Sequence, residues 1–151
     1  MGDARRTFLT PERFPDVETR FGWPQEVFTA EEFGPGWAVV LLFHDPKFDT
    51  PALTLALNSQ AGYVGLLGSP KTQADRRARL REVGFDEEAL ARIHGPVGLD
   101  LGGKEPALIA LSIMAEIIAV RYRHTGGMMS QKPDKPQPAT PSGPSCCGNK
   151  P

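Results

Sequence analysis

The stretch AGYVGLLGSPKTQADRRARL, residues 61–80, decides the fold class of this chain. Its first half is apolar and rich in small residues, which is typical of a strand buried on both faces of a parallel sheet. Its second half is polar and begins with Ser69 as a helix N-cap and Pro70 at the first helical position. A strand that runs directly into a helix predicts one step of a parallel α/β sheet.

The flanking segments repeat this step. The apolar run at residues 37–43 predicts another strand buried on both faces, and a short helix is expected from Asp49 or Thr50, with Pro51 in its first turn. DEEALARI predicts a helix capped by Asp86. VGLDLGG predicts a third short strand, and EPALIALSIMAEIIAVRYR predicts the longest helix, largely buried because apolar residues surround most of its circumference.

The segment before residue 37 gives weaker signals. RRTFLTPERFP predicts one short strand before a Pro-rich turn, and PQEVFTAEEF predicts one helical segment. No G-x-G-x-x-G turn follows a first strand, and no P-loop, G-x-S-x-G elbow or paired Cys/His metal spacing is found. We therefore expect an α/β fold: a Rossmann-like parallel sheet with flanking helices that lacks its opening β–α turn.

Composition and charge limit the classes of partner. The formal net charge is −1, which argues against a nucleic-acid-binding surface that covers the chain. No apolar run is long enough to span a membrane, and the N-terminus lacks the apolar segment of a secretory signal. These features predict a cytoplasmic protein with no nucleic-acid or membrane partner.

The composition changes at His124. From there the chain is dominated by Pro, Gly, Ser and Lys, so we expect a folded domain over residues 1–123 and a disordered tail over residues 124–151. The tail ends near Cys146 and Cys147. Two interpretations of this adjacent pair stay open, a soft-metal or sulfur-carrying site and an exposed pair without a task.

Polar residues and glycines follow each predicted strand, at the edge where open α/β sheets bind ligands. The helix start at Ser69 offers free N–H groups to an anion, and Lys71 in the first turn opposes the helix dipole, which a bound phosphate would relieve. The alternative is an ordinary capped helix with a solvated lysine. We interpret the arginines that follow as a solvated face, and the alternative is a site for a protein partner or a second anion; they are Arg76, Arg77, Arg79 and Arg81.

The ends of the other two predicted strands also allow two interpretations. His44 and Asp45 either bind or protonate a ligand, or Asp45 caps a turn before Pro46 while His44 completes local hydrogen bonds. His94 precedes Gly-Pro, where a structural role is favoured. Asp100 is an acidic residue at a strand end, a position typical of ribose or metal partners.

Four segments closely resemble the C-terminal Rossmann-like domain of the XdhC/CoxI family, the accessory proteins of xanthine dehydrogenase and carbon monoxide dehydrogenase. They are FHDPKFDTPAL, AGYVGLLGSPKTQADRRARL, RIHGPVGLDLGG and EPALIALSIMAEIIAVR. RRTFLTPERFP also matches, so the resemblance covers residues 3–122. It implies an accessory factor, without catalysis of its own, that binds the molybdenum cofactor and assists its insertion into a molybdenum hydroxylase.

The resemblance also implies partners and site residues. The partners are the hydroxylase client and a cysteine desulfurase that acts while the cofactor is guarded. No catalytic residue and no metal ligand is assigned. The implied cofactor-binding residues match the motifs H-D-P-K, G-S-R-R-T and G-L-D-I-G; they are His44, Asp45, Lys47, Gly68, Ser69, Lys71, Thr72, Gly98, Asp100 and Gly102.

The sequence departs from the family pattern in three places. Pro70 replaces the first basic residue of G-S-R-R-T, and residues 103–106 replace a more usual G-A-R-T-P. The family's N-terminal domain and first Rossmann strand have no counterpart, so we expect a sheet that is incomplete at its N-terminal side. An exposed sheet edge favours a homo-oligomer or a partner chain that supplies the N-terminal half. Alternative functions are therefore an NAD-type oxidoreductase domain and a half-domain that works only with a partner.

Overall fold

The computed structural model describes residues 1–43 and 45–131. The predictions for His44, Cys146 and Cys147 therefore lie outside the described residues. The elements follow one another as β1 (Gly2–Asp3), η1 (Arg6–Phe8), β2 (Arg20–Phe21), α1 (Pro24–Val27), η2 (Ala30–Glu32), β3 (Ala38–Leu41), α2 (Pro46–Asn58), β4 (Tyr63–Leu66), α3 (Pro70–Glu82), α4 (Glu87–Ala91), β5 (Ile93–His94), α5 (Pro106–Arg121) and η3 (Met129–Gln131).

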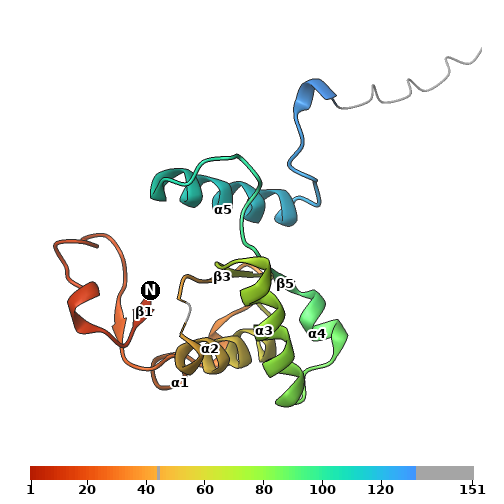
Figure 1. Ribbon diagram of the computed structural model, residues 1–151. Helices are drawn as coiled ribbons and strands as arrows, with labels where there is room; N and C mark the ends of the chain where they lie inside the picture. The colour runs from red at the N-terminus through yellow and green to blue at the C-terminus, as the bar shows by residue number, and fades with distance from the viewer. Residues whose placement is uncertain (44, 132–151) are drawn as a thin grey trace, which may run out of the picture.

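The strands form two small parallel sheets. One has the order β3-β4-β5, with Val39 opposite Val64 and Gly65 opposite His94, and the other consists of β1 and β2. Helices α2 and α3 cover one face of the larger sheet, and α5 lies on the other face (Figure 1). The predicted parallel α/β architecture is confirmed, and so is its incompleteness, because the two sheets are not hydrogen-bonded to each other.

The hydrophobic core lies between the larger sheet and the helices α2 and α3. All four residues of β4 are buried, as the sequence predicts for a central parallel strand. The side chains of lowest exposure in this cluster come from α2, β4, α3 and α4; they are Leu53, Ala56, Val64, Leu66, Leu80 and Leu90. A side chain does not fit at position 65, because a Cβ there would lie 2.7 Å from atoms of both Tyr63 and Val97.

Helix α3 begins and ends as its sequence predicts. The Ser69 hydroxyl accepts a hydrogen bond from the Thr72 N–H at 3.2 Å, and Pro70 occupies the first helical position. Gly84 follows the helix with a φ of +97°, a conformation that favours glycine at helix ends. Helix α4 is capped by Asp86, also as expected.

Helix α2 begins earlier than predicted. Asp45 is its N-cap and Pro46 takes the first position, so Asp49, Thr50 and Pro51 lie inside the helix. The predicted start was wrong because both prolines satisfy the first-turn rule, and the capping bond from the Lys47 N–H to Asp45 selects the earlier one.

The third predicted strand is absent from the described residues. VGLDLGG forms a loop, and the strand β5 lies just before it at Ile93–His94. The Val97 N–H still bonds to the Leu66 carbonyl at 3.0 Å, but positive φ values at Gly98 and Gly102 then turn the chain away from the sheet. In the N-terminal part, RRTFLTPERFP contains the 3-10 helix η1 instead of a strand.

Two burial predictions were wrong. Strand β3 is only partly buried, and its neighbours Trp37 and Leu42 are more than half exposed. Helix α5 exposes a row of apolar side chains instead of burying most of its surface; they are Leu108, Leu111, Met114, Ile118 and Tyr122. Both elements have the apolar composition of buried segments but lack a covering layer on one side. No helix in residues 1–43 and 45–131 is long and apolar enough to cross a membrane.

The structure describes the beginning of the predicted tail, residues 124–131. Residues 124–131 are all exposed and contain only η3.

Candidate functional site

The carboxyl ends of β3 and β4 lie side by side because these strands are paired in parallel. One buried side chain holds the two following loops together. The Arg76 guanidinium donates hydrogen bonds to the Phe43 carbonyl at 2.6 Å and to the Leu67 carbonyl at 2.5 Å. Its Nε donates to Asp49 at 2.7 Å, and both side chains are 1% exposed. This ion pair fixes the distance between the loops that carry the predicted site.

The interpretation of the four arginines as a solvated face was therefore wrong for Arg76. It was also wrong for Arg77, which donates hydrogen bonds to the carbonyls of Leu90 and Ile93. Along α3, Gln73, Arg76 and Leu80 are the buried residues, at the spacing of one helix face. That spacing is visible in the sequence, but a pattern of charges on one helix does not identify which guanidinium finds a buried carboxylate on another helix.

The N-terminus of α3 is an exposed polar feature at this edge. The Ser69 hydroxyl caps the helix through the Thr72 N–H and lies 3.0 Å from the Thr72 hydroxyl. Within the described part of the chain, the Lys71 N–H has no hydrogen-bond partner, and the Lys71 side chain is exposed. An unpaired N–H, two hydroxyls and an ammonium group together can bind a phosphate or another anion.

Gly68 shapes the entrance to this helix. Its φ is +141°, and a Cβ there would lie 3.0 Å from Nη1 of Arg76 and 3.2 Å from Cγ2 of Thr72. A larger residue would therefore press on the guanidinium that holds the two loops and on the methyl group of Thr72.

The N-terminus of α2 is arranged differently. The Asp45 carboxylate accepts the Lys47 N–H at 3.0 Å, and the Asp45 carbonyl accepts the N–H groups of Phe48 and Asp49. Asp45 therefore caps this helix end itself, and its side chain stays exposed. The exposed Lys47 side chain adds positive charge next to that carboxylate.

The loop after β5 is anchored from α5. The Gly98 N–H donates to Glu116 at 2.6 Å, and the Tyr63 hydroxyl donates to the same carboxylate oxygen at 2.6 Å. The other Glu116 oxygen lies 3.4 Å from Nδ1 of His94, whose ring stacks on Tyr63. Burial and the Glu116 carboxylate raise the pKa of Tyr63 far above its ordinary value, so its hydroxyl stays a donor. Glu116 and Tyr63 were not singled out from the sequence.

Asp100 and Gly102 follow this anchor. Asp100 is exposed, and Gly102 has a φ of +75° with open space around it. The structure thus joins the loops after β3 and β4 through Arg76. The loop after β5 is held to the end of β4 by the Val97–Leu66 hydrogen bond and to α5 by Glu116. Nothing in the described contacts joins Asp100 to Ser69 or Lys71.

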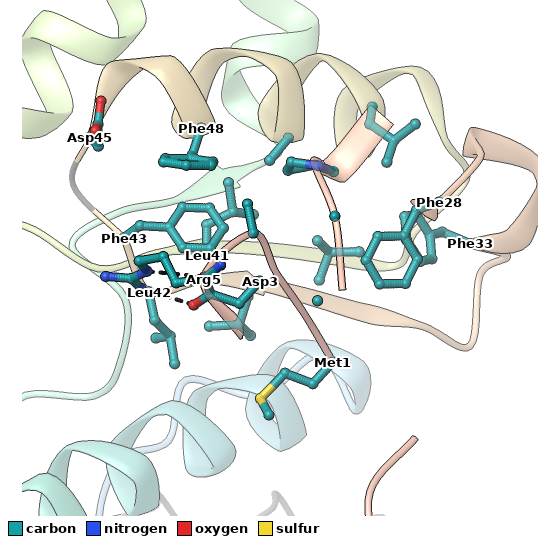
Figure 2. A pocket seen from close by; sticks show the side chains of 18 of the residues that line it. Met1, Asp3, Arg5, Phe28, Phe33, Leu41, Leu42, Phe43, Asp45 and Phe48 are labelled. Carbon is teal, nitrogen blue, oxygen red and sulfur yellow. Dashed lines mark hydrogen bonds and ion pairs between the residues drawn. The ribbon is translucent and has the colours of Figure 1, made fainter. Parts of the chain in front are cut away.

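A hollow of about 730 Å³ lies between β1 and β3, and among the predicted site residues that the structure describes, Asp45 lines it. Its walls are mostly apolar, with Phe43 and Phe48 on one side and Phe28 on the other (Figure 2). No group of three or more His, Cys, Asp or Glu side chains in the described residues is placed to hold a metal ion.

Comparison with known proteins identifies relatives of this chain. A family model described as the XdhC Rossmann domain matches residues 1–117. The chain is 33% identical over 143 residues to YqeB of Escherichia coli, an uncharacterized protein, with 90% of this chain and 25% of YqeB covered. It is 37% identical over 84 residues to the molybdenum cofactor insertion chaperone PaoD of Escherichia coli, with 56% and 26% covered.

Two further relatives come from Bacillus species. The chain is 30% identical over 122 residues to a Bacillus subtilis protein named as a probable xanthine dehydrogenase subunit, with 80% of this chain and 35% of that protein covered. A crystal structure of a xanthine dehydrogenase from Bacillus halodurans matches with a TM-score of 0.65 and 25% identity, over 85% of this chain and 37% of that one. The chain thus spans about a quarter to a third of the length of these curated relatives.

Proposed function

The chain belongs to the XdhC Rossmann-domain family, and from this membership we propose that it is an accessory factor in the maturation of molybdenum-cofactor enzymes. It binds the cofactor and passes it on, without a chemical step of its own. The support comes from relatives whose names describe a molybdenum cofactor insertion chaperone and a probable component of xanthine dehydrogenase. The observation that carries the proposal in this chain is the unpaired helix start at Lys71.

The residues at that helix start suit the phosphate of the cofactor. The Lys71 N–H and ammonium group supply positive potential. Because the hydroxyls of Ser69 and Thr72 are hydrogen-bonded to each other, this pair supplies one further O–H donor. Pro70 has no N–H, so the Lys71 N–H is the first one this helix can offer. The cofactor supplies the metal chemistry when bound; these residues bind and orient its anionic end.

The buried Arg76 supports the site indirectly. It does not reach the exposed helix start, but it holds the Phe43 and Leu67 carbonyls and so sets how far apart the two loops stand. Gly68 lies against its guanidinium, which keeps the space in front of α3 open. Asp45 and Lys47 border the same edge from α2, and we propose that they contact the organic part of the cofactor.

Lys71→Ala tests the anion site. We expect the variant to lose about 1–2 kcal/mol of binding free energy for molybdopterin, as for one charge-assisted contact. Binding is measured by calorimetry or fluorescence with molybdopterin and, separately, with NAD. Arg121→Ala is the matched control, because it removes an exposed cation at the far end of α5. Equal affinity of Lys71→Ala and the unaltered chain would refute the site, and tight binding of NAD alone would refute the function.

We propose a molybdenum hydroxylase of the xanthine dehydrogenase or carbon monoxide dehydrogenase type as the client, and a cysteine desulfurase as a second contact. The names of the relatives support the first of these. Mixing the cofactor-loaded chain with a cofactor-free hydroxylase and following the recovery of hydroxylase activity tests the transfer. Recovery no faster than with free cofactor would contradict a delivery role.

A further inference from the structure

Aromatic rings form a row just beyond the carboxyl ends of β2 and β3. Trp23 follows β2 and stacks on Phe48 of α2, with ring centroids 4.5 Å apart. Phe43 follows β3, and its ring centroid lies 6.2 Å from that of Phe48. Phe43 and Phe48 are only partly buried, and Trp23 is 37% exposed. A row of aromatic faces that stays partly open to solvent can hold a planar ring by stacking.

A carboxylate stands beside two of these rings. Phe43, Asp45 and Phe48 line one end of the hollow of about 730 Å³, and Phe28 lines the other end (Figure 2). A volume of this size is typical of sites for small organic ligands. Phe43, Asp45 and Phe48 all come after the last residue of β3, so a ligand beside them does not need the space between β1 and β3.

Asp45 carries the charge that is not balanced within this hollow. The other charged side chains that line it, Asp3 and Arg5, form an ion pair at 2.8 Å. Oδ1 of Asp45 accepts the Lys47 N–H at 3.0 Å, and in the described residues Oδ2 has no hydrogen-bond partner. Each carboxylate oxygen has two lone pairs, so both oxygens can accept a further hydrogen bond. The Asp45 carboxylate is therefore open to two N–H donors.

An acceptor group beside aromatic faces selects one class of planar ring. A carboxylate only accepts hydrogen bonds, so it matches a ring edge with two neighbouring N–H donors. The 2-amino-4-oxopyrimidine edge of a pterin or of guanine has two such donors. Adenine has one donor next to one acceptor, and that acceptor would face a carboxylate oxygen with no proton between them. The arrangement thus favours a 2-amino-4-oxopyrimidine ring over adenine.

We propose that Phe43 and Phe48 stack on a pterin ring, and that Asp45 accepts hydrogen bonds from its 2-amino group and the neighbouring ring N–H. This assignment rests on the proposed function, because a pterin is the organic part of the molybdenum cofactor. The ring then lies at the end of β3 and the phosphate at the start of α3, on two loops that Arg76 holds together. Neighbouring strands lie about 4.8 Å apart, so one ligand can reach both loops.

Titration of the full chain with 6-hydroxymethylpterin, guanosine and adenosine tests the ring site, because none of these probes carries a phosphate. We expect the pterin to bind about tenfold or more tightly than adenosine, as for one bidentate pair. The ring protons of Phe43 and Phe48 should shift in NMR spectra when the pterin is added. Equal binding of the pterin and adenosine would overturn the proposal. Tighter binding of guanosine than of the pterin would assign the site to a guanine nucleotide and would also overturn it.

Asp45→Asn tests the carboxylate without removing the helix cap, because asparagine caps a helix as well as aspartate does. An amide has one acceptor and one donor, which matches adenine, so the preference for the pterin over adenosine should fall about tenfold or more. Asp86→Asn makes the same change at the N-cap of α4 and should leave the preference unchanged. An unchanged preference in Asp45→Asn would contradict the proposed role of the carboxylate.

Phe48→Leu tests the stacking surface. It removes one aromatic face but keeps an apolar side chain, so binding of the pterin should weaken about fivefold or more. Phe28→Leu is the matched control at the other end of the hollow and should not change binding. Circular dichroism checks that both variants fold. Weaker binding in Phe28→Leu but not in Phe48→Leu would place the ring elsewhere and overturn the proposal.

Molybdopterin separates this proposal from the proposed function. If the chain binds molybdopterin and Asp45→Asn binds it equally well, the accessory function stands and the ring site is refuted. If the chain does not bind molybdopterin at all, both are refuted. Weaker binding of molybdopterin in Asp45→Asn, with no change in Asp86→Asn, is the result expected.

Discussion

The substitution Arg76→Met tests whether the buried ion pair holds the carboxyl edge together. Arg76 and Asp49 are each 1% exposed, and Oδ1 of Asp49 has no hydrogen-bond partner in the described residues. Methionine fills much of the same space but leaves the carboxylate buried without a counter-charge. Breaking a buried pair in this way costs about 3–5 kcal/mol.

Loss of the two carbonyl contacts adds to this cost. The Phe43 and Leu67 carbonyls each lose a charged donor, and an unsatisfied buried acceptor costs about 1–3 kcal/mol. The three contacts share one side chain, and the loops can reach water. We therefore expect the free energy of unfolding to fall by about 4 kcal/mol, which is less than the sum of the separate costs. A domain of this size has only about 5–15 kcal/mol of stability, so the variant is close to unfolding.

Urea denaturation followed by tryptophan fluorescence measures the loss, because the Trp23 ring stacks on Phe48 of α2 at 4.5 Å. Arg81→Met is the control on the same helix. Its ion pair with Glu87 is exposed to solvent, which screens it, so its loss should change the stability little. The double variant Asp49→Leu, Arg76→Met should recover part of the stability, since it removes both charges. A loss below about 1 kcal/mol for Arg76→Met would refute the assignment.

Two other substitutions test contacts outside this pair. Glu116→Ala removes the acceptor shared by the Tyr63 hydroxyl and the Gly98 N–H. We expect the free energy of unfolding to fall by about 2 kcal/mol and deuterium exchange over residues 106–121 to become faster. Glu116→Gln keeps one acceptor oxygen and should lose less stability. An exchange rate in α5 that does not change would contradict the anchoring role of Glu116. The hydrogen bonds from Arg5 hold the pKa of Asp3 below its ordinary value of 3.8, so this pair stabilises the fold at neutral pH and loses its effect as the pH falls through the lowered pKa. Asp3→Asn should therefore lower the stability only slightly at pH 7, because solvent screens the half-exposed Arg5, and should have no effect at a pH below that pKa. A loss of stability that stays constant with pH would exclude the ion pair as its cause.

Local signals explain why much of the fold could be predicted from the sequence. Strand β4 and helix α3 are specified by adjacent residues: an apolar run, then Ser69 and Pro70, then a glycine at the helix end. The same signals are ambiguous where two of them compete, as at Pro46 and Pro51, and the start of α2 was therefore misplaced. The family membership followed from the same motifs and is confirmed by the match over residues 1–117.

The candidate site also has a part that could be predicted from the sequence and a part that could not. The helix start with Ser69 and Lys71 could be predicted, because capping and the helix dipole act within a few residues of sequence. The role of Arg76 could not, since its partner Asp49 is 27 residues away and on another helix. Glu116 is likewise separated by 53 residues from Tyr63. Contacts of this kind depend on how helices pack, which local patterns do not encode.

By itself, then, the sequence determined which segments become strand or helix along the middle of the chain, because those preferences depend on neighbouring residues. Only the tertiary structure decided that β3 and α5 keep apolar surfaces exposed, although their composition is that of buried elements. Burial depends on what packs against a segment, and in the described residues nothing packs against the free edge of β3 or the outer row of α5. The physical reason is that the hydrophobic effect rewards the removal of apolar area from water without specifying which chain provides the cover.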